Sequence, residues 1–294
     1  MASRTLKFAI FGNTYQVKKS AFINNIIATL KESGAEVSID SEFYRFLVEG
    51  GRLSMPIDHV FHDGDFDADF VVSMGGDGTF LKAASRVGSK EIPIIGINTG
   101  RLGFLADIAS TDIVGPLNRI LDGDYVVEEH TALELDCGCN SKFEGRMVAL
   151  NEIAVLKQDS SSMITIQTEL DDQHLVDYQA DGLIIATPTG STAYSMSAGG
   201  PITHPHLECF CVTPICPHSL AARPMVFPDS LELTVRNICE REKSLFLTID
   251  GRTNYELFRG ETVSITKSDK TTRLITLKER GFYNTLRQKM TNGH

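Results

Sequence analysis

The chain has 294 residues, 42% of them hydrophobic and 22% charged, which is typical of a globular protein with a sizeable buried core. Its formal net charge of −10 argues against binding to nucleic acid or to an anionic membrane. No apolar run approaches the roughly 18 to 20 residues of a spanning helix, and the N-terminus lacks a signal-peptide core. The sequence therefore predicts a cytoplasmic protein.

The first hundred residues alternate strand and helix patterns. Strands are predicted at 6–11, 36–39, 70–73 and 92–97, and helices around 23–30, at 42–49 and at 79–87. Such alternation indicates a parallel, doubly wound sheet with helices on both faces. We therefore expect an α/β, Rossmann-like domain over residues 1–105.

The pattern changes beyond residue 105. After one predicted helix at 112–121, short alternating segments follow, separated by turn residues. The predicted strands are 131–136, 147–156, 164–170, 183–187, 231–235, 245–249 and 262–266. They indicate a β-rich domain over 106–270, and 271–294 is expected to be a C-terminal tail that docks back. The fold class is thus an α/β doubly wound N-terminal domain plus a β-rich C-terminal domain, α+β overall.

A glycine-rich loop, Gly75-Gly76-Asp77-Gly78-Thr79, stands between a predicted strand and a predicted helix. Ligands of parallel α/β sheets bind at this edge, glycines let the backbone approach them, and a helix N-terminus favours phosphate. An aspartate would repel a bound anion, so its presence favours phosphoryl chemistry, in which it accepts a proton or holds a cation. The alternative is a tight turn whose aspartate caps the next helix.

Two further polar segments interrupt apolar strands. In residues 181–201, DGLIIATPTGSTAYSMSAGGP, a strand runs into a hydroxyl-rich turn, which indicates either a cradle for a polar ligand or a helix with a Ser/Thr cap. Asn151 and Glu152 lie inside the apolar segment LNEIAV. Burying this pair without partners is costly, so we expect either a ligand rich in hydroxyl or amide groups or an internal hydrogen-bond network.

Two other patterns resemble metal sites but lack their spacing. Cys137 with Cys139, and Cys209 with Cys211, have CxC spacing, whereas structural zinc sites use CxxC-type pairs. We interpret these cysteines as reduced, half-buried thiols. The acidic run at 62–69 lacks the glycine and glutamate of a calcium loop and is interpreted as a solvated loop.

Together these segments resemble the NAD kinase family. The matching stretches are SMGGDGTFL (73–81), IGINTGRLGFL (95–105), LNEIAV (150–155), the segment 181–201, HSLAARP (218–224), TIDG (248–251) and GFYNTLRQK (281–289). The glycine loop by itself also occurs in lipid kinases of the diacylglycerol and sphingosine type. Its combination with the other stretches, in this order, is highly specific.

The resemblance implies a role for each matching position. Asp77 is expected to be the catalytic aspartate. The residues expected to contact substrate or cofactor are Gly75, Gly76, Gly78, Thr79, Asn151, Glu152, Asp181, Thr192, Ala193, Tyr194 and Ser197. Ser162, Gln179 and Arg252 stand where the family varies, which leaves their contacts open. No ligand role is assigned to His218 or Arg223.

The resemblance also implies a reaction and partners. The γ-phosphoryl group of ATP, with Mg²⁺, would pass to the 2′-hydroxyl of the adenosine ribose of NAD and give NADP. A homodimer or homotetramer is expected, in which partner subunits often complete the dinucleotide site. The rival functions are a lipid kinase with the same glycine loop, or a non-catalytic NADP(H)-binding sensor.

Overall fold

The computed structural model describes residues 4–14, 20–100, 102–106, 108–109, 113–138, 147–158, 162–240, 243–277 and 281–291. The chain divides into two compact units. The first comprises Met1–Glu129 with Thr272–His294, and the second comprises His130–Thr271. The first unit extends beyond the predicted boundary at residue 105 because Leu117 and Ile120 of helix α4 (Val114–Leu121) are buried in its core.

A parallel sheet forms the centre of the first unit. Its strands, in spatial order, are the C-terminal part of β18 (Thr262–Thr276), β5 (Ile94–Asn98), β4 (Phe70–Gly75), β1 (Lys7–Gly12), β2 (Glu36–Asp40) and β3 (His59–Phe61), with β6 (Ile108–Ala109) beside β5. All of these pairings are parallel. The helices of this unit are α1 (Ser20–Glu32), α2 (Ser41–Glu49), α3 (Asp77–Val87), α4 and α6 (Phe282–Thr291). The predicted α/β N-terminal domain is confirmed.

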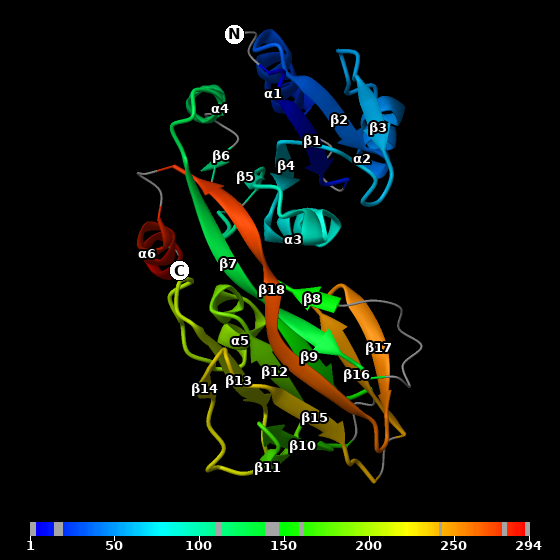
Figure 1. The fold of residues 1–294 in the computed structure, drawn as a ribbon, viewed down its shortest axis with the longest axis vertical. Coiled ribbons are helices and arrows are strands. Elements are labelled where there is room, and N and C mark those ends of the chain that lie inside the picture. Colours follow the sequence, from blue (N-terminus) through cyan, green and yellow to red (C-terminus); the bar gives the residue numbers. More distant parts are fainter. Residues whose placement is uncertain are drawn as a thin grey trace. The chain divides into compact units, whose positions relative to one another are not determined.

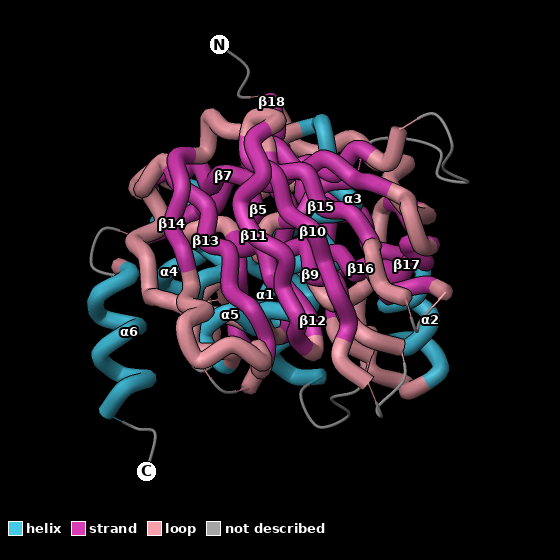
Figure 2. Tube along the Cα trace, turned by 90° about the horizontal axis from the view of Figure 1, so that it is seen from below, coloured by secondary structure: helices cyan, strands magenta, loops and turns pink. Residues whose placement is uncertain are grey.

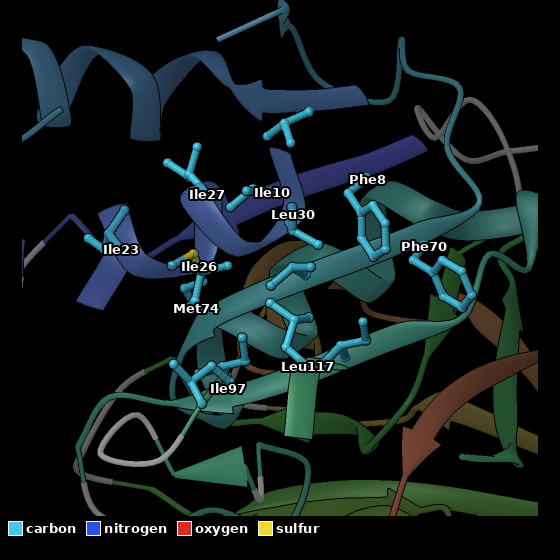
Figure 3. Packing of buried hydrophobic residues seen from close by; sticks show 14 of the residues in the cluster. Phe8, Ile10, Ile23, Ile26, Ile27, Leu30, Phe70, Met74, Ile97 and Leu117 are labelled. Atoms are coloured by element: carbon cyan, nitrogen blue, oxygen red, sulfur yellow. The ribbon is translucent and has the colours of Figure 1, made fainter. Parts of the chain in front are cut away.

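Helix α1 packs on one face of this sheet through residues at helical spacing. Its buried side chains are Ile23, Ile26, Ile27 and Leu30, as Figure 3 shows. They meet Phe8 and Ile10, which point to the same side because strand residues alternate between faces. Phe11 lies on the opposite side, where its ring makes an edge contact with Phe61. Each fully buried side chain of this size contributes about 1.5 to 3 kcal/mol.

The acidic run that follows β3 forms a surface loop. Asp63, Asp65 and Asp67 are exposed. Asp67 pairs with Lys7 at 2.7 Å, and Asp69 pairs with Arg4 at 2.8 Å. The interpretation of this run as a solvated loop is confirmed.

Two antiparallel sheets build the second unit (Figure 1). One has the order β14 (Met225–Pro228), β13 (Cys209–Ile215), β12 (Gly182–Ala186), β9 (Glu152–Leu156), β16 (Ser244–Ile249) and β17 (Thr253–Phe258). The other contains β11 (Gln173–Ala180), β10 (Ile164–Leu170), β15 (Leu233–Asn237) and the N-terminal part of β18, together with β7 (Val126–Asp136) and β8 (Met147–Ala149). In Figure 2, β13 and β14 run side by side, and so do β16 and β17.

Residues from both sheets share one core. Ile166 of β10 and Ile185 of β12 belong to the same buried cluster. The hairpin between β10 and β11 turns at Asp171 and Asp172, whose φ values of 47° and 61° are those of the two-residue turn that matches strand twist. This unit confirms the predicted β-rich C-terminal domain.

Several predicted strands have different bounds. The single strand expected at 147–156 is wrong, because β8 ends at Ala149 and β9 begins at Glu152. The strand expected at 262–266 continues to Thr276, where Leu274 pairs with Ile94 of β5. The strands that were not predicted are β3, β6, β11, β13, β14 and β17.

No helix in the described part of the chain is long and apolar enough to span a membrane.

Cys209 and Cys211 are buried in β13, and burial raises the pKa of the Cys211 thiol to about 11. Among the described residues, no three His, Cys, Asp or Glu side chains are grouped so as to hold a metal ion. Cys139 lies outside the described residues.

Candidate active site

The predicted site residues fall into two groups, one in each unit. In the first unit, β4 ends at Gly75 and α3 begins at Asp77, so the glycine loop lies at the carboxyl edge of the parallel sheet (Figure 1). Gly76 caps the helix, and its carbonyl oxygen accepts from the N–H of Thr79 at 2.9 Å. A Cβ at Gly75 would lie 2.1 Å from Thr79 Oγ1. Only glycine therefore fits between this strand and its helix.

The carboxylate of Asp77 does not cap its own helix. Asp77 is the first helical residue, and no side chain caps α3. Its carboxylate instead accepts hydrogen bonds from three consecutive backbone N–H groups, those of Phe104, Leu105 and Ala106, at 2.9, 3.0 and 3.1 Å. The interpretation of this aspartate as a helix cap is therefore wrong. Its side chain is held by the loop that follows β5.

In the second unit, the Asn151–Glu152 turn and the hydroxyl-rich turn lie together. Thr187 Oγ1 donates to the carbonyl oxygen of Leu150 at 2.6 Å and accepts from Gly190 N at 3.0 Å. A Cβ at Gly190 would stand 2.0 Å from the carbonyl oxygen of Asn151. The backbone N–H of Tyr194 also donates to the Glu152 carboxylate. The structure thus brings together two segments that are separate in the sequence.

The hydroxyl-rich turn continues into two short helical turns. These are a 3₁₀ turn at Thr189–Thr192 and helix α5 at Tyr194–Ser197. Thr192 and Ala193 are half-buried, whereas Tyr194 and Ser197 are exposed. This short helical segment therefore offers a ring face and hydroxyl groups at the surface beside Glu152.

Asp250 organises the Asn151–Glu152 turn. It lies between β16 and β17 with a φ of 49°, and its carboxylate accepts from the N–H groups of Leu150, Asn151 and Glu152 at 3.0, 2.8 and 3.0 Å. These N–H groups are drawn away from strand pairing, which explains why β8 and β9 are separate strands.

The carboxylate of Glu152 is buried beside that of Asp250. Burial, followed by the negative charge of Asp250, raises the pKa of Glu152 to about 7, against the opposing N–H of Tyr194. Burial also raises the pKa of Asp250, although its three N–H partners oppose this. Glu152 Oε2 is buried and has no hydrogen-bond partner among the described residues. Such an atom requires a ligand or a proton to be satisfied.

Asp181 lies away from this turn. It precedes β12, whose other end carries Ala186 opposite Glu152. The six steps along the chain from Asp181 to Thr187 span about 20 Å at roughly 3.3 Å each. Asp181 forms an ion pair with Lys157 at 2.7 Å. The structure therefore does not bring Asp181 together with Asn151 and Glu152.

The positions with open or unassigned roles lie outside the Asn151–Glu152 turn. The backbone N–H of His218 bonds to the carbonyl oxygen of Gln179 at 2.8 Å, and both residues are exposed. Arg223 Nη1 donates to the carbonyl oxygen of Ala222 at 2.8 Å. The positive charge of Arg252 opposes the rise in the pKa of Asp250 that burial causes.

Sequence reasoning missed two residues of these groups. Asp250 belongs to the matching stretch TIDG, but no role was predicted for it, although an aspartate and a glycine after an apolar strand repeat the Asp77-Gly78 pattern. Gly103 was not singled out. A Cβ there would lie 2.0 Å from Asp77 Oδ1, and no local pattern indicates this contact.

A parallel sheet with an aspartate-bearing glycine loop, combined with a β-rich unit that presents a hydroxyl-rich turn, defines a class of phosphate- and nucleotide-binding proteins. Comparison with known proteins narrows this class. The ATP-NAD kinase N-terminal domain matches residues 8–125, and the ATP-NAD kinase C-terminal domain matches residues 150–277. The chain belongs to the ATP-NAD kinase family.

Relatives and solved structures agree with this assignment. The chain is 47% identical to the NAD kinase of Bacteroides fragilis and 39% identical to that of Porphyromonas gingivalis, each over 289 residues and 98% of both chains. A structure of an NAD kinase from Archaeoglobus fulgidus in complex with ATP is 27% identical, with a TM-score of 0.76 over 96% of this chain and 99% of that one. Yeast NADH kinase complexed with NADH has a TM-score of 0.87 over 98% and 88%, and at 22% identity it supports the fold alone.

Proposed function

We propose that this chain is an NAD kinase that transfers the γ-phosphoryl group of ATP to the 2′-hydroxyl of the adenosine ribose of NAD, giving NADP. The observation that carries the proposal is the carboxylate of Asp77, held by three backbone N–H groups at the head of α3. Family membership supports the same reaction.

Asp77 orients the acceptor hydroxyl and takes its proton. An aspartate is a weak base, so the proton moves late, as the bond to phosphorus forms. Gly75, Gly76 and Gly78 allow the backbone to approach the phosphates, and the N-terminus of α3 adds partial positive charge there. Thr79 fills the space beside Gly75. Positioning of this kind provides most of the catalysis in phosphoryl transfer.

The second unit binds the dinucleotide. Asn151 and Glu152 hydrogen bond to its polar groups, and this role is supported by the buried, unpartnered Oε2 of Glu152. The adenosine cradle is formed by Thr192, Ala193, Tyr194 and Ser197. The exposed ring of Tyr194 suits stacking against a base.

Asp181 contacts a dinucleotide bound mainly by another copy of the chain, in a homodimer or homotetramer. Support comes from the length of β12, which separates Asp181 from the Asn151–Glu152 turn by about 20 Å. The family resemblance implies the same sharing of sites between subunits. Lys157, which pairs with Asp181, partly neutralises its charge before the ligand arrives.

Mg²⁺ fits this site as part of the ATP complex. The ion commonly keeps several waters and is bound through substrate phosphates, so it would reach this site on the triphosphate that the glycine loop receives. When bound, the ion neutralises charge on the triphosphate. The protein's own part is to hold the phosphates with the loop and to orient the acceptor hydroxyl.

The test is a coupled assay. The protein is incubated with ATP, Mg²⁺ and NAD, and NADP is followed with an NADP-specific dehydrogenase. We expect turnover in the natural chain and a loss of about 100- to 10,000-fold in kcat for Asp77→Asn, since general-base groups contribute this much. Asp67→Asn is the matched control, because this aspartate is exposed and forms a surface ion pair with Lys7.

The rivals predict different results. A sensor would bind NADP(H) but produce no NADP from any phosphoryl donor. A lipid kinase would phosphorylate diacylglycerol or sphingosine in vesicles and leave NAD unchanged. Full activity of Asp77→Asn would overturn the assignment of the catalytic aspartate.

A further inference from the structure

The carboxylate of Asp77 is held in one orientation by the loop after β5. Oδ1 accepts from the N–H groups of Leu105 and Ala106, and Oδ2 accepts from that of Phe104. Three bonds to one loop restrict the rotation of the side chain, and catalytic groups need such restriction to remain aligned.

Gly103 makes this orientation possible. A Cβ at this position would lie 2.0 Å from Asp77 Oδ1, 2.7 Å from Cγ and 3.0 Å from Oδ2. The carboxylate therefore lies directly on the α-carbon of Gly103. Gly103 is not among the glycines with a positive φ, so its backbone conformation is open to other residues. The requirement for glycine here comes from the carboxylate of Asp77.

The loop itself has no room to move back. Its other side rests on Gly96 of β5, where a Cβ would lie 2.4 Å from the carbonyl oxygen of Leu105 and 2.8 Å from the α-carbon of Ala106. Asn98 Nδ2 donates to the carbonyl oxygen of Ala106 at 3.3 Å. A methyl group at Gly103 therefore displaces the side chain of Asp77 and leaves the loop in place.

The bonds also distinguish the two oxygens. A carboxylate has about four acceptor sites, two on each oxygen. The two N–H groups on Oδ1 fill that atom, whereas Oδ2 carries one N–H group among the described contacts. Oδ2 thus retains one lone pair.

We propose that Gly103 is a positioning residue for phosphoryl transfer. By lacking a side chain it leaves the space in which the Asp77 carboxylate lies, so that the remaining lone pair of Oδ2 receives the acceptor hydroxyl. This inference rests on the proposed function. In the step, the ribose oxygen forms a bond to the γ-phosphorus as the bond from phosphorus to the bridging oxygen of ADP breaks. ADP leaves with that electron pair, and the hydroxyl proton moves to Oδ2.

The first test is Gly103→Ala, assayed with ATP, Mg²⁺ and NAD. We expect kcat to fall about 100-fold while the KM for NAD changes less than about 3-fold, because a shift of the reacting group by about 1 Å has an effect of this size. Gly281→Ala is the matched control, since a Cβ there meets nothing within 4 Å, and its kcat should be unchanged. Unchanged kcat in Gly103→Ala would overturn the proposal.

A double-mutant cycle separates positioning from general damage to the loop. In an Asp77→Ala background the clash partner is absent, so Gly103→Ala should change neither the residual turnover nor the melting temperature. The double variant remains informative even if Gly103→Ala alone fails to fold, because it lacks the side chain with which the new methyl group clashes. If Gly103→Ala lowered the melting temperature equally in both backgrounds, the methyl group would clash with a group other than Asp77, and the inference would be contradicted. Absence of NADP formation by the natural chain would instead sink the proposed function.

Discussion

The same arrangement of hydrogen bonds occurs in both units. In the first unit, Asp77 accepts from the N–H groups of residues 104–106, and in the second, Asp250 accepts from those of residues 150–152. Each carboxylate thereby fixes a turn distant in sequence from itself. One carboxylate opens a helix, whereas the other lies in a left-handed turn between two strands.

The surroundings of the two aspartates differ. Beside Asp77, the close-packed glycine is Gly103, and it faces a side chain. Beside Asp250, the close-packed glycine is Gly190, and it faces the backbone of Asn151. Asp250 also lies next to the buried carboxylate of Glu152, whose pKa is raised first by burial and then by the negative charge of Asp250. Under the proposed function, the same hydrogen-bond pattern would serve two purposes: near Asp77 it would orient the reacting group, and near Asp250 it would support the surface that binds the dinucleotide.

Asp250→Ala should have the largest effect on stability. The substitution removes the acceptor of three backbone N–H groups and leaves them without a partner. We therefore expect the free energy of unfolding to fall by about 4 kcal/mol. The KM for NAD should rise as well, because Asn151 and Glu152 lose their support. Chemical unfolding and the coupled assay measure the two effects. Asp136→Ala, which removes the acceptor of one exposed N–H at Gly138, should cost well under half as much. Equal losses in the two variants would contradict the comparison.

Gly190→Ala should have the next largest effect on stability. It should lower the free energy of unfolding by about 2 to 3 kcal/mol, because its Cβ would overlap the backbone of Asn151, which cannot rotate away. Gly103→Ala is the comparison, since its clash is with a side chain that can swing aside. We expect Gly190→Ala to lower the melting temperature more and Gly103→Ala to lower kcat more. If both variants lost stability equally, the distinction between the two regions would fail.

The local parts of this arrangement could be predicted from the sequence, and the distant parts could not. The strand, glycine loop and helix at 70–87 follow from apolar spacing and glycine placement over a short stretch. The contacts of Asp77 and Asp250 join residues 27 and 100 positions apart, so no local pattern indicates them. The sequence LNEIAV indicates one apolar strand, but its first three N–H groups donate to the distant carboxylate of Asp250 and the strand is divided there. Strand β13 was missed, and Pro214, which pairs with Leu183 inside the sheet, is a residue that argues against a central strand.

Glu152→Gln should have the smallest effect of these variants. It tests the buried carboxylate of Glu152 through the pH dependence of the free energy of unfolding. The native state raises the pKa of Glu152 from 4.5 to about 7, so it binds the proton more tightly than the unfolded chain does. The natural chain is therefore fully stabilised by this group below about pH 4.5 and loses that stabilisation as pH rises to about 7.

The glutamine variant does not titrate at this position. Between pH 5 and 8, the free energy of unfolding of this variant should rise by about 2 kcal/mol relative to that of the natural chain. This is less than the roughly 3.4 kcal/mol that the full shift from 4.5 to about 7 allows at about 1.4 kcal/mol for each pKa unit, because part of the titration lies below pH 5. Glu42→Gln is the control, because Lys82 lowers the pKa of Glu42 through a hydrogen bond and its charge. That carboxylate stays ionised across this range, so its difference from the natural chain should be constant. A constant difference for Glu152→Gln as well would mean that Glu152 is already ionised at pH 5, and the contrast between the two aspartates would then lose its electrostatic part.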